Sequence, residues 1–212
     1  MNPIDQTLQM SFPTVMVPRR ESVAPMVGLG ERLLAASNGV FIEIVRPWVH
    51  IVRRIASFQV RTAIPYGVAE EVTELLCGKV PGDVISEFAR LAQEASPKET
   101  GAWIVWSEMT RRFRMVPVQI LSHSEGHLRY DRPEIEADEV LVIDCHSHGR
   151  GPAFFSRTDN ADDAHDVKFA LVLGHCDTDR FSAALRLCAK GIFEETSVPA
   201  TWTQSLSVRE VQ

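Results

Sequence analysis

Apolar residues recur at helical spacing near the middle of the chain. They stand three or four positions apart at Val84, Ile85, Phe88, Leu91 and Ala92. This spacing is typical of a helix that buries one face. Pro81 suits the first turn of such a helix, and the Ser96-Pro97 pair ends it. The pattern predicts a helix over residues 81–95.

Short apolar runs follow this helix and predict strands. They lie at 102–106, 116–121, 140–145, 169–173 and 184–187, with a polar segment at 122–138. The run at 140–145 is apolar almost throughout, as expected of a strand that is covered on both faces at the centre of a sheet. A helix followed by several strands predicts an α+β domain with αβα layers.

The first 75 residues have a different pattern. Prolines at 3, 13, 18 and 25 exclude a long helix there and predict a loose arm with a short extended piece at 14–17. A short helix is expected at 31–37. After it, the Asn38-Gly39 pair predicts a turn, and β-branched runs predict strands at 40–45, 49–55 and 58–64. We therefore expect a small β-rich accessory unit over residues 1–75 and a second domain over 76–212.

Composition narrows the class of protein. The 212 residues are 45% hydrophobic and 24% charged, an ordinary globular mixture that excludes a disordered or low-complexity chain. The net charge of −6 and a pI near 5.7 predict no nucleic-acid binding through bulk charge. The four cysteines form no CxxC pair, which excludes a four-thiolate zinc ribbon and suggests free thiols in a reducing compartment.

The sequence lacks the marks of membrane attachment and nucleotide binding. It has no run of 18 apolar residues, and its N-terminus lacks the basic start and apolar core of a secretory signal. Residue 2 is asparagine, so a myristoylation site is excluded. Neither GxGxxG nor GxxxxGK[ST] occurs. These features predict a cytoplasmic chain without a membrane partner.

Candidate chemistry is concentrated after the run at 140–145. His146 and His148 stand two apart at the end of that expected strand, so both imidazoles point to one face. Such a pair supplies half of a zinc site. The glycines and proline of residues 149–152 allow the chain to fold back, so that Asp159 could provide a third ligand.

Three protein ligands would leave a fourth position for water, as in catalytic zinc sites. A zinc ion lowers the pKa of water and polarises a carbonyl group, and the reaction then needs a proton acceptor that is not a ligand. Glu99, just before the expected strand at 102–106, is the first candidate, and Glu94 and Glu108 are alternatives. The hydroxyl of Ser156 could stabilise an oxyanion.

This set resembles the JAB/MPN metalloprotease family, whose JAMM motif has a glutamate upstream of His-x-His, seven residues, Ser, two residues and Asp. His146, His148, Ser156 and Asp159 have this spacing. The resemblance covers residues 80–195 and implies a cytidine-deaminase-like αβα fold and one Zn²⁺ per chain. It implies that His146, His148 and Asp159 bind zinc, that Glu99 activates water and that Ser156 stabilises the intermediate.

The sequence departs from this family's pattern at two points. Gly149 replaces a usual proline, which we expect to loosen the loop after His148. Gly101 follows Thr100 directly, which makes the register of Glu99 less certain.

Shorter strings at 46–48, 65–67 and 153–163 are similar to a bacterial branch of the family that belongs to the PRTRC cassette. Neighbouring proteins in that cassette resemble a ubiquitin-activating enzyme and small ubiquitin-like proteins. The resemblance implies a zinc-dependent isopeptidase or peptidase that acts at the C-terminus of a ubiquitin-like protein or its conjugate, with a ubiquitin-activating-like partner. The alternatives are a catalytically silent scaffold of the same fold and a zinc hydrolase of a small molecule.

Several residues also allow a structural interpretation. Ser156 and Asp159 have the spacing of a helix-capping pair, which is compatible with a ligand role. The acidic residues at 162, 163 and 166 suggest a solvated face, and Cys145 suggests a buried small side chain. Trp103 and Trp106 are expected to pack in the core.

Overall fold

The computed structural model describes residues 2–59 and 63–207. The chain forms two compact units, residues 1–79 and residues 80–212. Each unit has its own β-sheet. The fold is α+β, with a β-rich N-terminal unit, as the sequence predicts.

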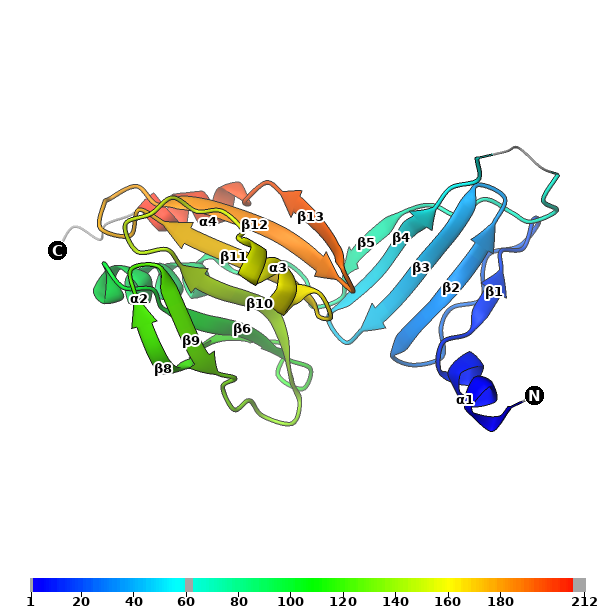
Figure 1. The fold of residues 1–212 in the computed structure, drawn as a ribbon, viewed down its shortest axis with the longest axis horizontal. Helices are drawn as coiled ribbons and strands as arrows, with labels where there is room; N and C mark the ends of the chain where they lie inside the picture. The colour runs from blue at the N-terminus through cyan, green and yellow to red at the C-terminus, as the bar shows by residue number, and fades with distance from the viewer. Residues whose placement is uncertain (1, 60–62, 208–212) are drawn as a thin grey trace. The chain divides into compact units, whose positions relative to one another are not determined.

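The N-terminal unit is built on a five-stranded sheet in the order β1-β2-β3-β4-β5 (Figure 1). Strand β1 runs parallel to β2, and the other neighbours are antiparallel. The elements are α1 (Pro3–Ser11), β1 (Thr14–Met16), β2 (Gly30–Ala36), β3 (Gly39–Arg46), β4 (Val49–Ala56) and β5 (Val72–Leu75).

The turn at Asn38-Gly39 joins β2 to β3, as predicted. Gly39 has a φ of +143°, and a Cβ there would lie 2.3 Å from the carbonyl oxygen of Ala56. Glycine is therefore required by both conformation and space. Alternate residues of these strands, including Leu34 and Phe41, pack with Val17 into a small apolar core. This alternation decides which face of the sheet is covered.

Three expectations for this unit are wrong. Residues 31–37 were expected to be helical but lie mostly in β2, because Leu34 and Ala36 alternate into the core and tertiary packing overrides helix propensity. The expected loose arm contains α1, which fits between prolines and has Asn2 as its N-cap. The strand expected at 58–64 is not present where the chain is described, and residues 60–62 lie outside the described part.

The C-terminal unit contains a six-stranded mixed sheet in the order β13-β12-β11-β10-β6-β7 and a separate two-stranded sheet, β8-β9. Its elements are α2 (Gly82–Ala95), β6 (Gly101–Ser107), β7 (Phe113–Pro117), β8 (Gln119–Ser124), β9 (His127–Asp131), β10 (Glu139–Ser147), α3 (Arg157–Asp163), β11 (Val167–Gly174), β12 (Ser182–Ala189), β13 (Ile192–Thr196) and α4 (Ala200–Ser207).

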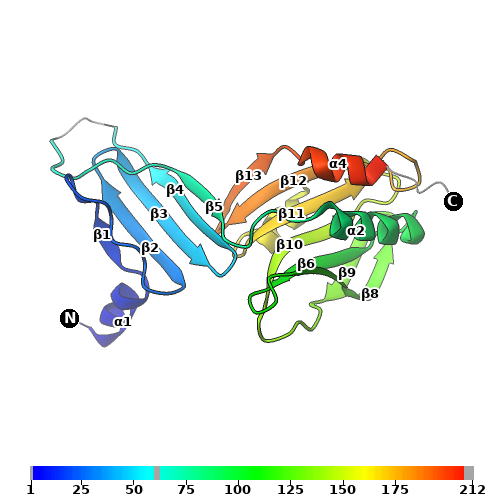
Figure 2. The same ribbon diagram turned by 180° about the vertical axis from the view of Figure 1, so that it is seen from behind.

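Helices cover both faces of the larger sheet. Helices α2 and α4 lie together on one face, as Figure 2 shows, and α3 lies on the opposite face (Figure 1). The indole of Trp202 on α4 donates to the carbonyl of Val80 at 3.0 Å, which ties α4 to the start of the unit. The predicted helix at 81–95 and the central strand at 140–145 are both confirmed.

The polar segment at 122–138 is not an open loop as expected. The strand expected at 116–121 is divided between β7 and β8, and β8 then forms a hairpin with β9. The side chains of Ile120 and Tyr130 on this hairpin pack against a buried cluster that includes Trp103 and Val105 of β6. The hairpin thus lies against the side of the sheet that also carries His146.

No helix in the described part of the chain is long and apolar enough to cross a membrane.

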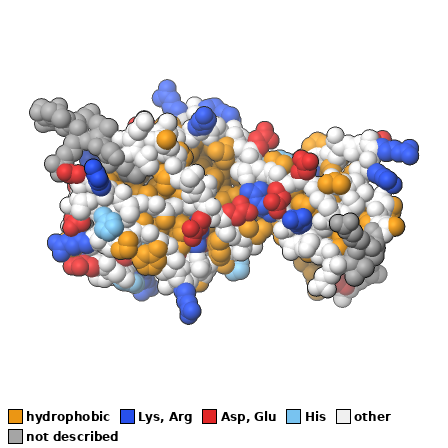
Figure 3. Space-filling view, turned by 90° about the horizontal axis from the view of Figure 1, so that it is seen from above, with side chains coloured by type: hydrophobic (Ala, Val, Ile, Leu, Met, Phe, Trp, Pro, Cys, Tyr) orange, Lys and Arg blue, Asp and Glu red, His pale blue; other side chains and the backbone are white. Residues whose placement is uncertain are grey.

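On the face shown in Figure 3, the lysine and arginine side chains of the described residues are interspersed with acidic ones.

Candidate metal centre

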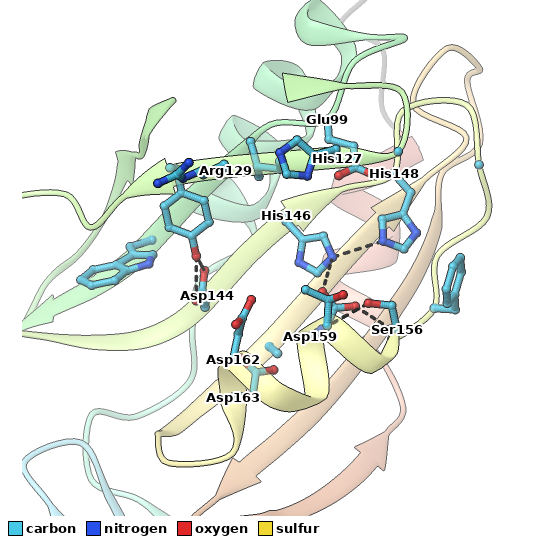
Figure 4. A pocket seen from close by; sticks show the side chains of 18 of the residues that line it. Glu99, His127, Arg129, Asp144, His146, His148, Ser156, Asp159, Asp162 and Asp163 are labelled. Carbon is cyan, nitrogen blue, oxygen red and sulfur yellow. Dashed lines mark hydrogen bonds and ion pairs between the residues drawn. The ribbon is translucent and has the colours of Figure 1, made fainter. Parts of the chain in front are cut away.

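The two histidines extend from the end of the central strand β10 into a cleft (Figure 4). Along β10, Cys145 and Ser147 are buried while Asp144 and His146 line the cleft. This alternation follows from the two-residue period of a strand. The cleft has a volume of about 620 Å³ and is lined by residues of β6, β9, β10, β11, α3 and their adjoining loops. A site at the carboxyl end of a central strand is common in open mixed and parallel sheets.

Potential metal-ligand atoms of His146, His148 and Asp159 lie within 4.8 Å of one another. The two Nε2 atoms are 3.2 Å apart, and Nε2 of His146 is 3.5 Å from Oδ1 of Asp159. Ligands about 2.0–2.1 Å from a tetrahedral zinc lie about 3.3–3.4 Å from each other. The observed separations therefore fit a zinc-sized tetrahedral site with three protein ligands.

Hydrogen bonds orient two of these side chains. Nδ1 of His148 is 3.0 Å from the carbonyl oxygen of Pro152, an acceptor, so Nδ1 carries the proton and Nε2 is free to coordinate. The backbone N–H of Ser156 donates to Oδ2 of Asp159 at 2.5 Å, and the Ser156 hydroxyl accepts from the Asp159 N–H at 3.2 Å. This capping box leaves Oδ1 of Asp159 for the metal, so the capping and ligand roles are compatible.

The surroundings of His146 favour a neutral imidazole. Burial lowers the pKa of His146, and the neighbouring Asp159 carboxylate opposes this effect. Metal coordination requires the neutral imidazole, because the ligand nitrogen must have a free lone pair.

The loop after His148 is tightly packed, contrary to the expected loosening at Gly149. Gly149 has a φ of +52°, and a Cβ there would lie 2.1 Å from the carbonyl oxygen of Pro97. Its own carbonyl accepts a hydrogen bond from the N–H of Cys176 at 2.7 Å, while that of Gly151 accepts from His175 at 2.8 Å. The glycines allow the close backbone approach that holds this loop.

Glu99 reaches the same cleft from the end opposite α3. It immediately precedes Thr100, which exchanges hydrogen bonds with Ser147: the Thr100 N–H donates to the Ser147 hydroxyl at 3.0 Å, and the Ser147 N–H donates to the Thr100 carbonyl at 2.9 Å. Because β6 and β10 pair with Gly101 opposite His146, this antiparallel register brings Glu99 opposite His148.

The environment of Glu99 suits a proton acceptor. Burial raises the pKa of Glu99, and the nearby His148 opposes that increase. A carboxylate with a raised pKa is a better base near neutral pH. The alternatives Glu94 and Glu108 are exposed and are not among the residues that line the cleft.

One part of the cleft wall, formed by the β8-β9 hairpin, is not predicted by the sequence. The β8-β9 hairpin contributes His127, Arg129 and Tyr130 to the lining. The sequence offers no partner for His127, because its proximity to Glu99 depends on the β8-β9 hairpin, which the polar pattern at 122–138 does not predict.

The expectation of a solvated face at residues 162, 163 and 166 is also wrong in part. Asp163 is buried, and its carboxylate contacts Lys168 at 2.8 Å and Arg186 at 2.6 Å. These two cations lie on later strands, so local sequence gave no sign of the pairing.

The side chains of all four cysteines are buried and form no disulfide bond. Burial raises the pKa of Cys145, which keeps its thiol protonated. Trp103 and Trp106 are buried, as expected. His175, Cys176 and Asp177 are not among the groups of described residues whose ligand atoms lie close enough to share an ion.

Two family models match consecutive parts of the chain. A domain of unknown function, DUF2016, matches residues 2–76, and a family described as prokaryotic homologs of the JAB domain matches residues 81–187. A search of curated proteins found no match. The solution structure of protein DSY2949 from Desulfitobacterium hafniense is similar at 17% identity and a TM-score of 0.42, over 55% of this chain and 87% of that one. The chain belongs to the family of prokaryotic homologs of the JAB domain.

Proposed function

We propose that this protein is a zinc-dependent peptidase or isopeptidase. The observation that carries the proposal is the convergence of His146, His148, Asp159 and Glu99 in one cleft. The first three supply a ligand set of zinc-like dimensions, and the fourth is a carboxylate outside that set with a raised pKa. A scaffold of the same fold has no chemical need for these four side chains together.

A zinc ion held by His146, His148 and Asp159 would polarise the substrate carbonyl and lower the pKa of a water molecule. Glu99 would accept a proton from the attacking water and return it to the leaving amine. The hydroxyl of Ser156, the N-cap residue of α3, would donate a hydrogen bond to the substrate carbonyl oxygen as negative charge develops there.

For the substrate, we propose the extended C-terminal tail of a ubiquitin-like protein or of its conjugate, with a ubiquitin-activating-like partner. This rests on the resemblance in the sequence. The β8-β9 hairpin beside the cleft forms a separate two-stranded sheet, whose strand edge could pair with such a tail.

The proposal is tested by cleavage of a reporter peptide joined through an amide bond to the C-terminus of a ubiquitin-like protein. Zinc-loaded protein is expected to release the reporter, as followed by mass spectrometry. Glu99→Gln should reduce the rate about 10²–10⁴-fold, the usual contribution of a general base. Glu94→Gln, an exposed carboxylate outside the cleft, should leave the rate unchanged.

If zinc-loaded protein cleaves none of a panel of ubiquitin-like fusions, the proposed substrate class is wrong. Cleavage that survives Glu99→Gln would contradict the assigned base.

A further inference from the structure

A buried lysine, Lys168, lines the same cleft as the candidate metal centre. Nζ of Lys168 is 2.6 Å from Asp144, 2.8 Å from Asp163 and 3.4 Å from Asp166. Its side chain is 5% exposed. An ammonium group removed from water in this way is stabilised only by such close carboxylates, so the cluster has a defined geometry.

The partners of Lys168 belong to the two elements that carry metal ligands. Asp144 lies on β10, two residues before His146, and both side chains line the cleft. Asp163 is the last residue of α3, four residues after Asp159, about one helical turn away. Lys168 itself lies on β11, which pairs with β10. One ammonium group thus connects the strand of His146 with the helix of Asp159.

This connection matters because α3 is not part of a hydrogen-bonded sheet. His146 has its position set by the strand pairing of β10, whereas the position of α3 depends on contacts of its side chains and flanking loops. The separation of 3.5 Å between His146 and Asp159 depends on the placement of the helix against the strand.

A second buried cation, on the neighbouring strand β12, also contacts α3. Arg186 on β12 contacts Asp163 and the side-chain oxygen of Asn160, and its guanidinium stacks over the rings of Phe155 and Phe193 at 4.0 and 4.4 Å. These contacts anchor α3 to β12, while Lys168 connects the end of α3 to Asp144 of β10.

We propose that Lys168 is a positioning residue for the metal centre: through Asp144 and Asp163 it holds Asp159 at coordinating distance from His146. This inference rests on the proposed zinc site. It predicts an effect on metal affinity that is separate from any effect on folding.

The test is the zinc affinity of the full chain, measured by competition with a chromophoric chelator. Lys168→Met should weaken zinc binding about 10–100-fold, the usual effect of losing a group that orients a metal ligand. The absorption spectrum of the cobalt-loaded variant should also change, because the geometry of the ligands is altered. Lys190→Met, an exposed lysine at the end of β12, should bind zinc and cobalt like the wild type.

Wild-type zinc affinity and an unchanged cobalt spectrum in Lys168→Met would overturn the positioning role while leaving the metal centre intact. Absence of zinc binding by the wild type would overturn the proposed function itself, and the positioning role with it. If Lys168→Met does not fold, Asp144→Asn keeps the shape of the side chain, and the same loss of affinity is expected. Unchanged affinity in that variant would equally contradict the proposal.

Discussion

The carboxylate of Glu99 lies where its charged form is disfavoured. Burial raises its pKa, so the folded protein binds a proton more tightly there than the unfolded chain does. The stability associated with this group is therefore greatest below the pKa of the unfolded chain and is lost as pH rises through the folded pKa. A group suited to proton transfer thus costs the metal-free protein stability at neutral pH.

Glu99→Gln is expected to raise the melting temperature of the zinc-free protein at pH 7, by about 1–3 °C. The difference should disappear on acidification, because Glu99 then becomes neutral. Thermal unfolding of both proteins at several pH values measures this effect. A variant that is less stable than the wild type at neutral pH would contradict the assigned environment of Glu99.

In the zinc-loaded protein, burial raises the pKa of Glu99 and the charge of the metal ion opposes that increase, so activity depends on the pKa that Glu99 has beside the ion. The value of kcat/KM should fall as pH decreases through the Glu99 pKa, since the base must be unprotonated. A pH profile of reporter cleavage checks this. A kcat/KM that does not fall on acidification, at any pH at which the protein stays folded and zinc-loaded, would argue against Glu99 as the base.

Gly149→Ala should destabilise the protein by more than about 1 kcal/mol, because a left-handed backbone is unfavourable for alanine and its Cβ would overlap the Pro97 carbonyl. Zinc affinity should fall too, since this loop carries the carbonyl of Pro152 that orients His148. Gly126→Ala is the matched control, because a Cβ there meets no atom within 4 Å. Chemical denaturation and chelator competition give the two readouts. If Gly149→Ala and Gly126→Ala have the same stability and the same zinc affinity, the backbone of Gly149 does not lie close against the Pro97 carbonyl.

At the scale of elements, the site depends on the register of β6 with β10 and on the start of α3. The sequence predicts the central strand, the paired histidines and the capping spacing, because each depends on residues close together in the chain. It does not predict the β8-β9 hairpin, whose polar residues face the cleft, or the pairing of Asp163 with Lys168 and Arg186. Such contacts join residues from different helices and strands, and the local sequence pattern carries no signal for them.

The start of α3 also makes a prediction. Ser156→Ala removes the hydroxyl that accepts from the Asp159 N–H and should lower stability by about 1 kcal/mol. It should weaken zinc binding as well, because the first turn of the helix orients the Asp159 carboxylate. Thr158→Ala, at an exposed position in the same turn, provides the comparison. If both variants match the wild type in denaturation and zinc titration, the capping box does not support the site.

At the scale of the whole molecule, the boundary of the structural units lies between residues 79 and 80, and the two family models match on either side of it. Every residue that lines the candidate cleft belongs to the C-terminal unit. The residues of the proposed chemistry thus lie within one unit, and we propose that the N-terminal unit acts as an accessory that docks a substrate or partner.

The central claim is that His146, His148 and Asp159 bind zinc, and metal content tests it most directly. Elemental analysis of the purified protein, after zinc loading and removal of excess metal, should find about one zinc per chain. The double variant His146→Ala, His148→Ala should retain none, whereas His165→Ala, an exposed histidine outside the cleft, should retain the wild-type content. Wild-type protein that repeatedly holds no zinc, or a double variant that holds as much as the wild type, would contradict the account.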